Sequence, residues 1–128
     1  ILNIFYNYTN ILLNPSLYKD KYLGELTSSL VDSEKAKFIS RKLADFSNLI
    51  WINSNPIILD WNGNYWRKRP SNMNEILRIQ KNIQVKNIID ISVWNDKMIK
   101  KYTMDNIHFN HEGMTYILNQ IIEKIENK

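Results

Sequence analysis

The sequence contains no cysteine and only two histidines, His108 and His111. The lack of cysteine excludes disulfide bonds and thiolate metal sites, and it leaves the redox compartment open. The two histidines stand three residues apart, close to Asp105, on a segment that reads as a loop. A zinc site made from these three residues is an alternative that we disfavour, because no further histidine or cysteine is present to complete it. The sequence therefore predicts neither a metal nor a cofactor.

Long apolar runs are also absent. No run approaches the roughly 20 residues that cross a bilayer as a helix, so no membrane span is predicted. The chain carries 17 basic and 13 acidic residues, for a formal net charge of +4. The basic residues are scattered, without the interleaved aromatics of a nucleic-acid groove, so we expect no nucleic-acid partner. The first residue is Ile1, so we expect a fragment or a processed product, and localisation stays open.

The length of 128 residues suits one domain with a real core, and not two. Hydrophobic residues make up 44% and charged residues 23%, as in an ordinary globular protein. Because we find neither an internal repeat nor a linker, we expect a single α/β domain over residues 1–128.

The pattern of apolar residues predicts strands and helices in alternation. Short apolar runs predict strands at 1–6, 49–52 and 85–93. Capping residues and apolar positions at helical spacing predict helices at 16–30, 32–48, 72–80 and 114–125. The caps are Ser16, Asp32 and, for the last helix, Asn110. Of the remaining segments, 57–59 extend a strand or line a pocket, 60–70 are irregular, and 96–102 form a short polar connector or one helical turn.

This alternation favours a parallel sheet with crossover helices on its faces. The strands are apolar throughout, which fits a sheet covered on both sides. In open parallel sheets, sites form at the carboxyl ends of the strands. Three loops would gather there, namely 7–10, 53–56 and the segment that leads to Asp105 and His108.

Asp105 and His108 are the strongest candidates for catalysis. A neutral imidazole takes a proton from a serine hydroxyl only when it is held in the right tautomer and orientation. A nearby carboxylate that accepts from the other ring nitrogen does this, and it stabilises the imidazolium that forms. Three residues of separation on a loop allow the two side chains to converge, although the pair also occurs by chance.

The run Asp105–Gly113 (DNIHFNHEG), with the amphipathic helix that follows it, resembles the C-terminal block of the SGNH (GDSL) hydrolase family. That block reads Asp-x-x-His, usually then Pro-Asn, and then a Gly at the opening of the last helix. Asn110 and Gly113 match it, whereas Phe109 replaces the usual Pro. The strand that ends in Asp90 and the run at 49–52 with its exit loop to Pro56 also resemble the family. The resemblance covers residues 34–127 with fair continuity and the first 30 residues weakly.

The resemblance implies a three-layer α/β/α fold with a parallel sheet, of flavodoxin-like architecture. It implies an esterase, lipase or carbohydrate O-acyl hydrolase that acts on a small-molecule or glycan ester. His108 is then the general base and Asp105 its orienting carboxylate.

The family's nucleophile is a serine in a Gly-Asp-Ser block, and this chain has none, because none of Gly24, Gly63 and Gly113 precedes Asp-Ser. We therefore expect a missing N-terminal segment to carry the nucleophile, and the chain alone to be inactive. The family's oxyanion asparagine would fall at Asn10, or at Asn7 after a shift of the loop. The Gly and Asp of that block have no counterpart here.

Residues 61–69 form a loop rich in aromatic and basic residues, which include Trp61 and Trp66. The loop could cover the active site and stack on a sugar, or it could be a surface loop with one Trp in the core. Ser54 and Ser92 stand near predicted strand ends and are alternative nucleophiles, but neither lies in a Gly-flanked elbow.

Other functions stay open at the level of the sequence. One is a non-catalytic α/β module, a remnant of such an enzyme, that binds a partner or glycan. Another is an acyltransferase acting on envelope glycans. An unrelated flavodoxin-like or receiver-like domain is a further alternative, although no acidic cluster follows the first predicted strand as a receiver requires.

Overall fold

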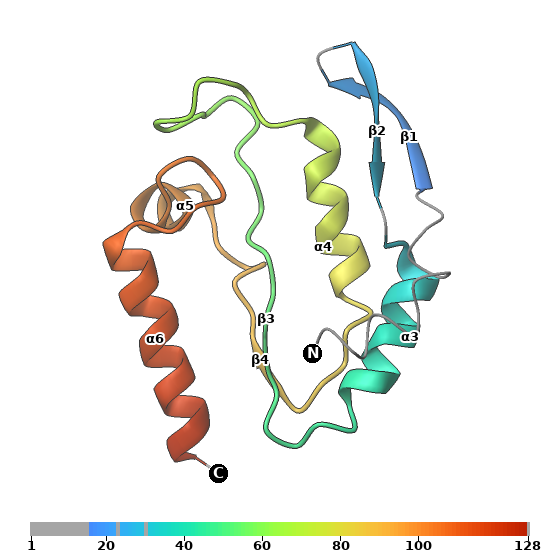
Figure 1. Ribbon diagram of the computed structural model, residues 1–128. Helices are drawn as coiled ribbons and strands as arrows, with labels where there is room; N and C mark the ends of the chain where they lie inside the picture. Colours follow the sequence, from blue (N-terminus) through green and yellow to red (C-terminus); the bar gives the residue numbers. More distant parts are fainter. Residues whose placement is uncertain (1–15, 23, 30, 128) are drawn as a thin grey trace.

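The computed structural model describes residues 16–22, 24–29 and 31–127 of the chain (Figure 1). The strand predicted at 1–6 and the candidate oxyanion residues Asn7 and Asn10 lie outside the described residues.

The centre of the structure is a parallel pair of short strands, β3 (Ile50–Ile52) and β4 (Asn87–Ile89). Trp51 pairs with Ile88, and the backbone N–H of Asn53 extends the ladder by donating to the carbonyl of Ile89 at 3.0 Å. The strands predicted at 49–52 and 85–93 are thus present, the second one shorter than predicted. Asp90 ends it, because its Oδ1 accepts from the backbone N–H of Ser92 and turns the chain.

Helices flank this pair on two sides (Figure 1). α3 (Ser33–Leu43) and α4 (Glu75–Gln80), preceded by the 3₁₀ turn η1 (Ser71–Asn74), lie on one side, and α6 (His111–Glu126) lies on the other. One apolar cluster, around Ala36, Ile79 and Ile83, joins α3 and α4 to Trp51. A second cluster joins β4 to α5 (Asp96–Tyr102) and α6, and it consists of Ile89, Ile91, Trp94, Ile99 and Ile117. The described residues therefore form a small mixed α/β domain.

The helix predicted at 16–30 is wrong. These residues form an antiparallel hairpin of β1 (Ser16–Tyr22) and β2 (Glu25–Ser29), with Tyr22 opposite Glu25. Gly24 turns the chain at a φ of 89°, a left-handed conformation that suits glycine and ends a helix. Thr27, Ser28 and Ser29 are also weak helix formers, so local propensity gave the helix little support.

The other helices differ from the predictions mainly at their ends. Asp32 caps α3 as predicted, since its Oδ1 accepts from the backbone N–H of Lys35 at 2.9 Å. The helix ends at Leu43 rather than near 48, and Phe46 is exposed, because turns at 43–49 replace the helical hydrogen bonds. The predicted connector at 96–102 is the helix α5, capped by the side chain of Asn95. Among the residues described, no helix is both long and apolar enough to cross a bilayer.

Candidate active site

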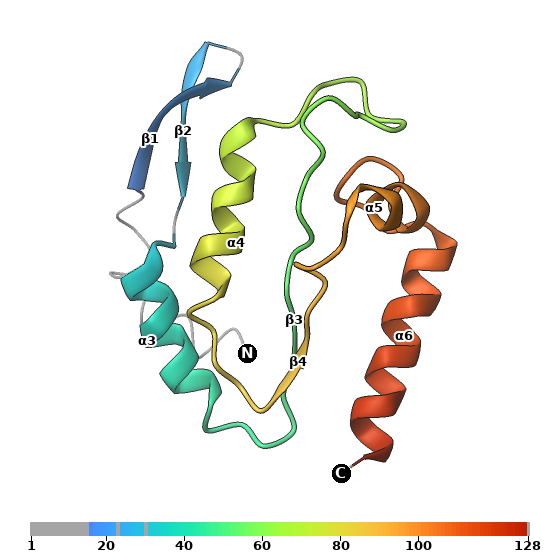
Figure 2. The ribbon, with the colours of Figure 1, turned by 180° about the vertical axis from the view of Figure 1, so that it is seen from behind.

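The segment from Thr103 to Asn110 joins α5 to α6 as a tight loop, near the ends at which β3 and β4 leave the sheet (Figure 2). Its two sides meet at a bridge between Thr103 and Phe109, and the backbone N–H of Met104 donates to the carbonyl of His108 at 2.8 Å. The loop is thus closed on itself, so Asp105 and His108 stand on a fixed turn.

The carboxylate of Asp105 is buried and fully used as an acceptor. Oδ1 accepts from the backbone N–H groups of Ile107 at 3.1 Å and His108 at 2.8 Å. Oδ2 lies 2.8 Å from Nδ1 of His108 and 2.9 Å from Nη2 of Arg69. Four donors therefore fix the orientation of one carboxylate whose side chain is only 5% exposed.

These contacts also fix the charge of Asp105. Burial by itself raises the pKa of the carboxyl group. Hydrogen bonds from the backbone and ring of His108 and from the backbone of Ile107 outweigh burial and lower the pKa to about 2. Asp105 is therefore an anion at neutral pH.

The side chains of the two sequence candidates, His108 and Asp105, are in contact. Its side chain is 63% exposed, while Nδ1 is held by Asp105. An ionised carboxylate at Nδ1 favours the tautomer that has its proton on Nδ1, which leaves Nε2 as a free acceptor. Nε2 has no hydrogen-bond partner within the described parts of the chain, so it is open to take a proton from an incoming hydroxyl group.

Asn106 holds this loop to the chain that leaves β3, a role that the sequence analysis did not identify. The residue is 1% exposed and has a φ of 76°, a conformation that asparagine tolerates better than most residues. Its carbonyl oxygen accepts from the side chain of Asn55 at 2.8 Å, and its own side chain binds the backbone of Ile58. The only available signal was an asparagine beside the candidate Asp, which is weak in an Asn-rich chain.

Arg69 is the second residue that the sequence analysis missed. Its side chain is 13% exposed, and its guanidinium lies over the ring of Tyr65 at 3.7 Å from the centroid. The ion pair with Asp105 joins the loop at 61–69 to the loop between α5 and α6. Sequence alone showed a run of three basic residues and did not distinguish the one that turns inward.

The two tryptophans of that loop differ in position. Trp61 packs against the core cluster of β4, α5 and α6. Trp66 is 71% exposed, and Arg67 covers one face of its ring at 3.4 Å. Of the two candidate substrate contacts, Trp66 is exposed and Trp61 is partly buried.

The start of α6 supports the loop from the other end. Oδ1 of Asn110 accepts from the backbone N–H of Gly113 at 2.9 Å, which confirms the predicted cap. Its Nδ2 donates to the carbonyl of Lys101 at 2.7 Å, and so it ties α6 to α5. A Cβ on Gly113 would overlap the carbonyl oxygen of Tyr102, so glycine allows this close approach.

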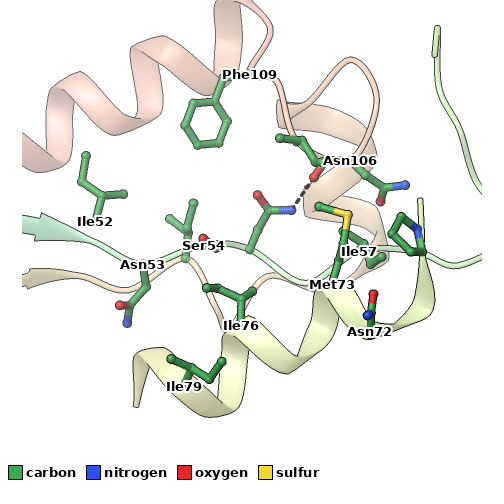
Figure 3. Close-up of a pocket in the computed structure, with 14 residues that line it drawn as sticks. Ile52, Asn53, Ser54, Ile57, Asn72, Met73, Ile76, Ile79, Asn106 and Phe109 are labelled. Carbon is green, nitrogen blue, oxygen red and sulfur yellow. Dashed lines mark hydrogen bonds between the residues drawn. The ribbon is translucent and has the colours of Figure 1, made fainter. Parts of the chain in front are cut away.

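A pocket of about 670 Å³ adjoins the loop (Figure 3). Its wall includes Ile107 and Phe109, the neighbours of His108 in sequence, and the chain that leaves β3 at Asn53, Ser54 and Asn55. Figure 3 shows Phe109 and the α4 residue Ile76 on opposite sides of it. The lining is mostly apolar. Ile57 contributes to it, so the expectation that residues 57–59 line a pocket is confirmed for this residue.

The remaining candidates do not join this site as nucleophiles or ligands. Ser92 donates its hydroxyl to Asp90, and neither Ser54 nor Ser92 is hydrogen-bonded to His108 in the described structure. No group of three or more His, Cys, Asp or Glu side chains suited to a metal ion occurs among the residues described.

Comparisons with known proteins add no assignment. No protein-family model, no curated protein and no solved structure matched the chain.

Proposed function

We propose that this chain carries the base of a serine-type ester hydrolase of three-layer α/β/α architecture, with His108 as general base and Asp105 as its orienting carboxylate. The observation that supports this most directly is the 2.8 Å contact between Nδ1 of His108 and Oδ2 of Asp105. A buried, ionised carboxylate and an exposed imidazole make that contact. This is the arrangement that general-base activation of a hydroxyl group requires.

In the proposed reaction, Nε2 of His108 takes the proton of a serine hydroxyl as the oxygen attacks the ester carbonyl carbon. Nε2 then gives that proton to the leaving alcohol, and an acyl-serine remains. A water molecule, deprotonated by the same nitrogen, releases the acid and restores the serine. Asp105 stays an anion throughout and stabilises the imidazolium form of His108.

The proposal places the nucleophilic serine on a polypeptide segment outside these 128 residues, since the chain has no Gly-Asp-Ser block. Asn10, or Asn7, would donate to the oxyanion. The acyl group of the ester would enter the pocket beside Ile107 and Phe109, whose apolar lining suits it. Trp66 would contact the alcohol or sugar part.

A non-catalytic binding module is the second candidate. It is favoured by the finding that no serine hydroxyl of the described residues contacts His108. Such a module would use the same pocket without turnover, and an acyltransferase would use the same base with an alcohol in place of water.

Covalent labelling tests the proposal. The polypeptide encoded by the complete reading frame should react with a fluorophosphonate probe at one serine and should hydrolyse p-nitrophenyl acetate. His108→Ala should abolish both activities, and the matched variant His111→Ala should retain them. The 128 residues alone should show neither activity. Absence of labelling and turnover in the longer polypeptide would favour the binding module, and turnover by the 128 residues that is lost in His108→Ala would show that the nucleophile lies within them.

A further inference from the structure

One oxygen of Asp105 serves two cationic or potentially cationic partners. Oδ2 lies 2.8 Å from Nδ1 of His108 and 2.9 Å from Nη2 of Arg69. Both the carboxylate and the guanidinium are largely buried, at 5% and 13% exposure, so solvent screens this pair weakly. The charge that faces the imidazole is therefore shared with an arginine.

The position of Arg69 is set on both sides. Its guanidinium stacks on the ring of Tyr65 at 3.7 Å from the centroid and donates to Asp105 from Nη2. A planar guanidinium held in this way loses little further freedom when it binds a carboxylate. Arg69 is therefore held in place to share the charge of Asp105.

Other charged groups of the surrounding elements are engaged elsewhere. Lys68 on the same loop pairs with Asp60, Arg67 lies over Trp66, and at the junction of α5 and α6 Lys101 pairs with Glu112. His111, the first residue of α6, is exposed. Among the described residues, Arg69 and His108 are the only charged or ionisable side chains that form an ion pair with the Asp105 carboxylate.

We propose that Arg69 acts on His108 through Asp105, because it shares the charge of the carboxylate and leaves less of that charge facing the imidazole. The meaning of this role for catalysis rests on the proposed function, because only a base that stays neutral can accept a proton. With Arg69 absent, the whole negative charge of Asp105 faces the ring, and the imidazolium form becomes more stable.

The rate of carbethoxylation of His108 by diethyl pyrocarbonate tests this without any need for turnover. The reagent modifies neutral imidazole, and mass spectrometry of peptides separates His108 from His111, which serves as an internal reference in every sample. At about pH 6, Arg69→Gln should slow the modification of His108 relative to His111 by roughly threefold. Arg69→Met, which keeps an unbranched side chain without the charge, should do the same, and Arg69→Lys should keep most of the original rate.

Arg67→Gln is the matched control, because it removes a neighbouring arginine that contacts Trp66 instead of Asp105, and it should leave the ratio unchanged. If the ion pair only stabilised the fold, the modification of His108 would not become slower. Loss of Arg69 would then release His108 from Asp105, and the rate of modification would stay equal or rise. Either of those results would overturn the proposal. The proposal would also be overturned if Arg69→Gln and Arg69→Met both unfold while Arg69→Lys stays folded. The outcome is independent of the serine, so it stands apart from the labelling test of the proposed function.

Discussion

The side chain of Asn106 binds the backbone of Ile58 through both of its polar atoms. Its Oδ1 accepts from the N–H of Ile58 at 2.7 Å, and its Nδ2 donates to the carbonyl of the same residue at 3.1 Å. An asparagine side chain thus replaces a backbone bridge between the loop that bears His108 and the chain that leaves β3. The carbonyl of Trp61 is a further acceptor for Nδ2.

Asn106→Ala should therefore destabilise the protein strongly. The change removes a buried amide and leaves the N–H of Ile58 and the carbonyl of Trp61 without their side-chain partner, while the carbonyl of Ile58 keeps the N–H of Trp61. We expect a loss of about 3 kcal/mol in the free energy of unfolding, measured by urea denaturation. The control is Asn119→Ala, on an exposed position of α6, which should change stability by less than about 0.5 kcal/mol. Similar losses in both variants would contradict the role given to Asn106.

Gly63 should tolerate a side chain much less well than Gly24. Both have positive φ, 58° and 89°, so Ala at either position costs about 1 kcal/mol in backbone strain. A Cβ at Gly63 would also overlap the carbonyl oxygen of Met104, next to Asp105, whereas a Cβ at Gly24 would meet nothing within 4 Å. Gly63→Ala should therefore lower the free energy of unfolding by about 3 kcal/mol or more, and Gly24→Ala by about 1 kcal/mol.

Chemical denaturation of the two variants beside the parent chain measures this difference. Equal effects would mean that the loop at 61–69 moves aside without cost. In that case it would not hold the Asp105 turn in place.

The parts of the site that could be predicted from sequence are those made by residues close together in the chain. Asp105 and His108 are three positions apart, and the caps Asp32 and Asn110 bind N–H groups within one helical turn. Each of these contacts depends on a few dihedral angles, so the residue types and their spacing were sufficient.

Contacts between distant segments could not be predicted in this way. Arg69 lies 36 positions before Asp105, and Ile58 lies 48 positions before Asn106. Nothing in either local pattern distinguishes Arg69 from Arg67 or Asn106 from other asparagines, because the choice is made by how the loops pack. The hairpin at 16–29 was missed for a related reason. Local propensity gave the helix little support there, but the pairing of β1 with β2 that forms the hairpin cannot be read from the local pattern.

The ionisation of Asp105 should make the stability of the protein depend on pH in a defined acid range. Its pKa of about 2 in the folded state lies below the ordinary value of 3.8. The folded state thus takes up this proton less readily than the unfolded chain, and stability from the carboxylate is lost as the pH falls from about 5 to about 2. The shift corresponds to about 2 kcal/mol, which is fully present at neutral pH.

Asp105→Asn isolates this contribution, since the amide cannot ionise. The difference in free energy of unfolding between the parent chain and Asp105→Asn should narrow by about 2 kcal/mol as the pH is lowered over that range. Asp90, whose pKa is also lowered by hydrogen bonds from Ser92 and Asn53, contributes equally to both proteins and cancels in the difference. Asp60→Asn removes an exposed carboxylate of the neighbouring loop and is the matched control. The free energies of unfolding of the parent chain and Asp105→Asn could instead differ by a constant amount between about pH 5 and about pH 2. This result would mean that the hydrogen bonds to Asp105 do not favour its anion. His108 would then lack the charged partner that the proposed mechanism requires.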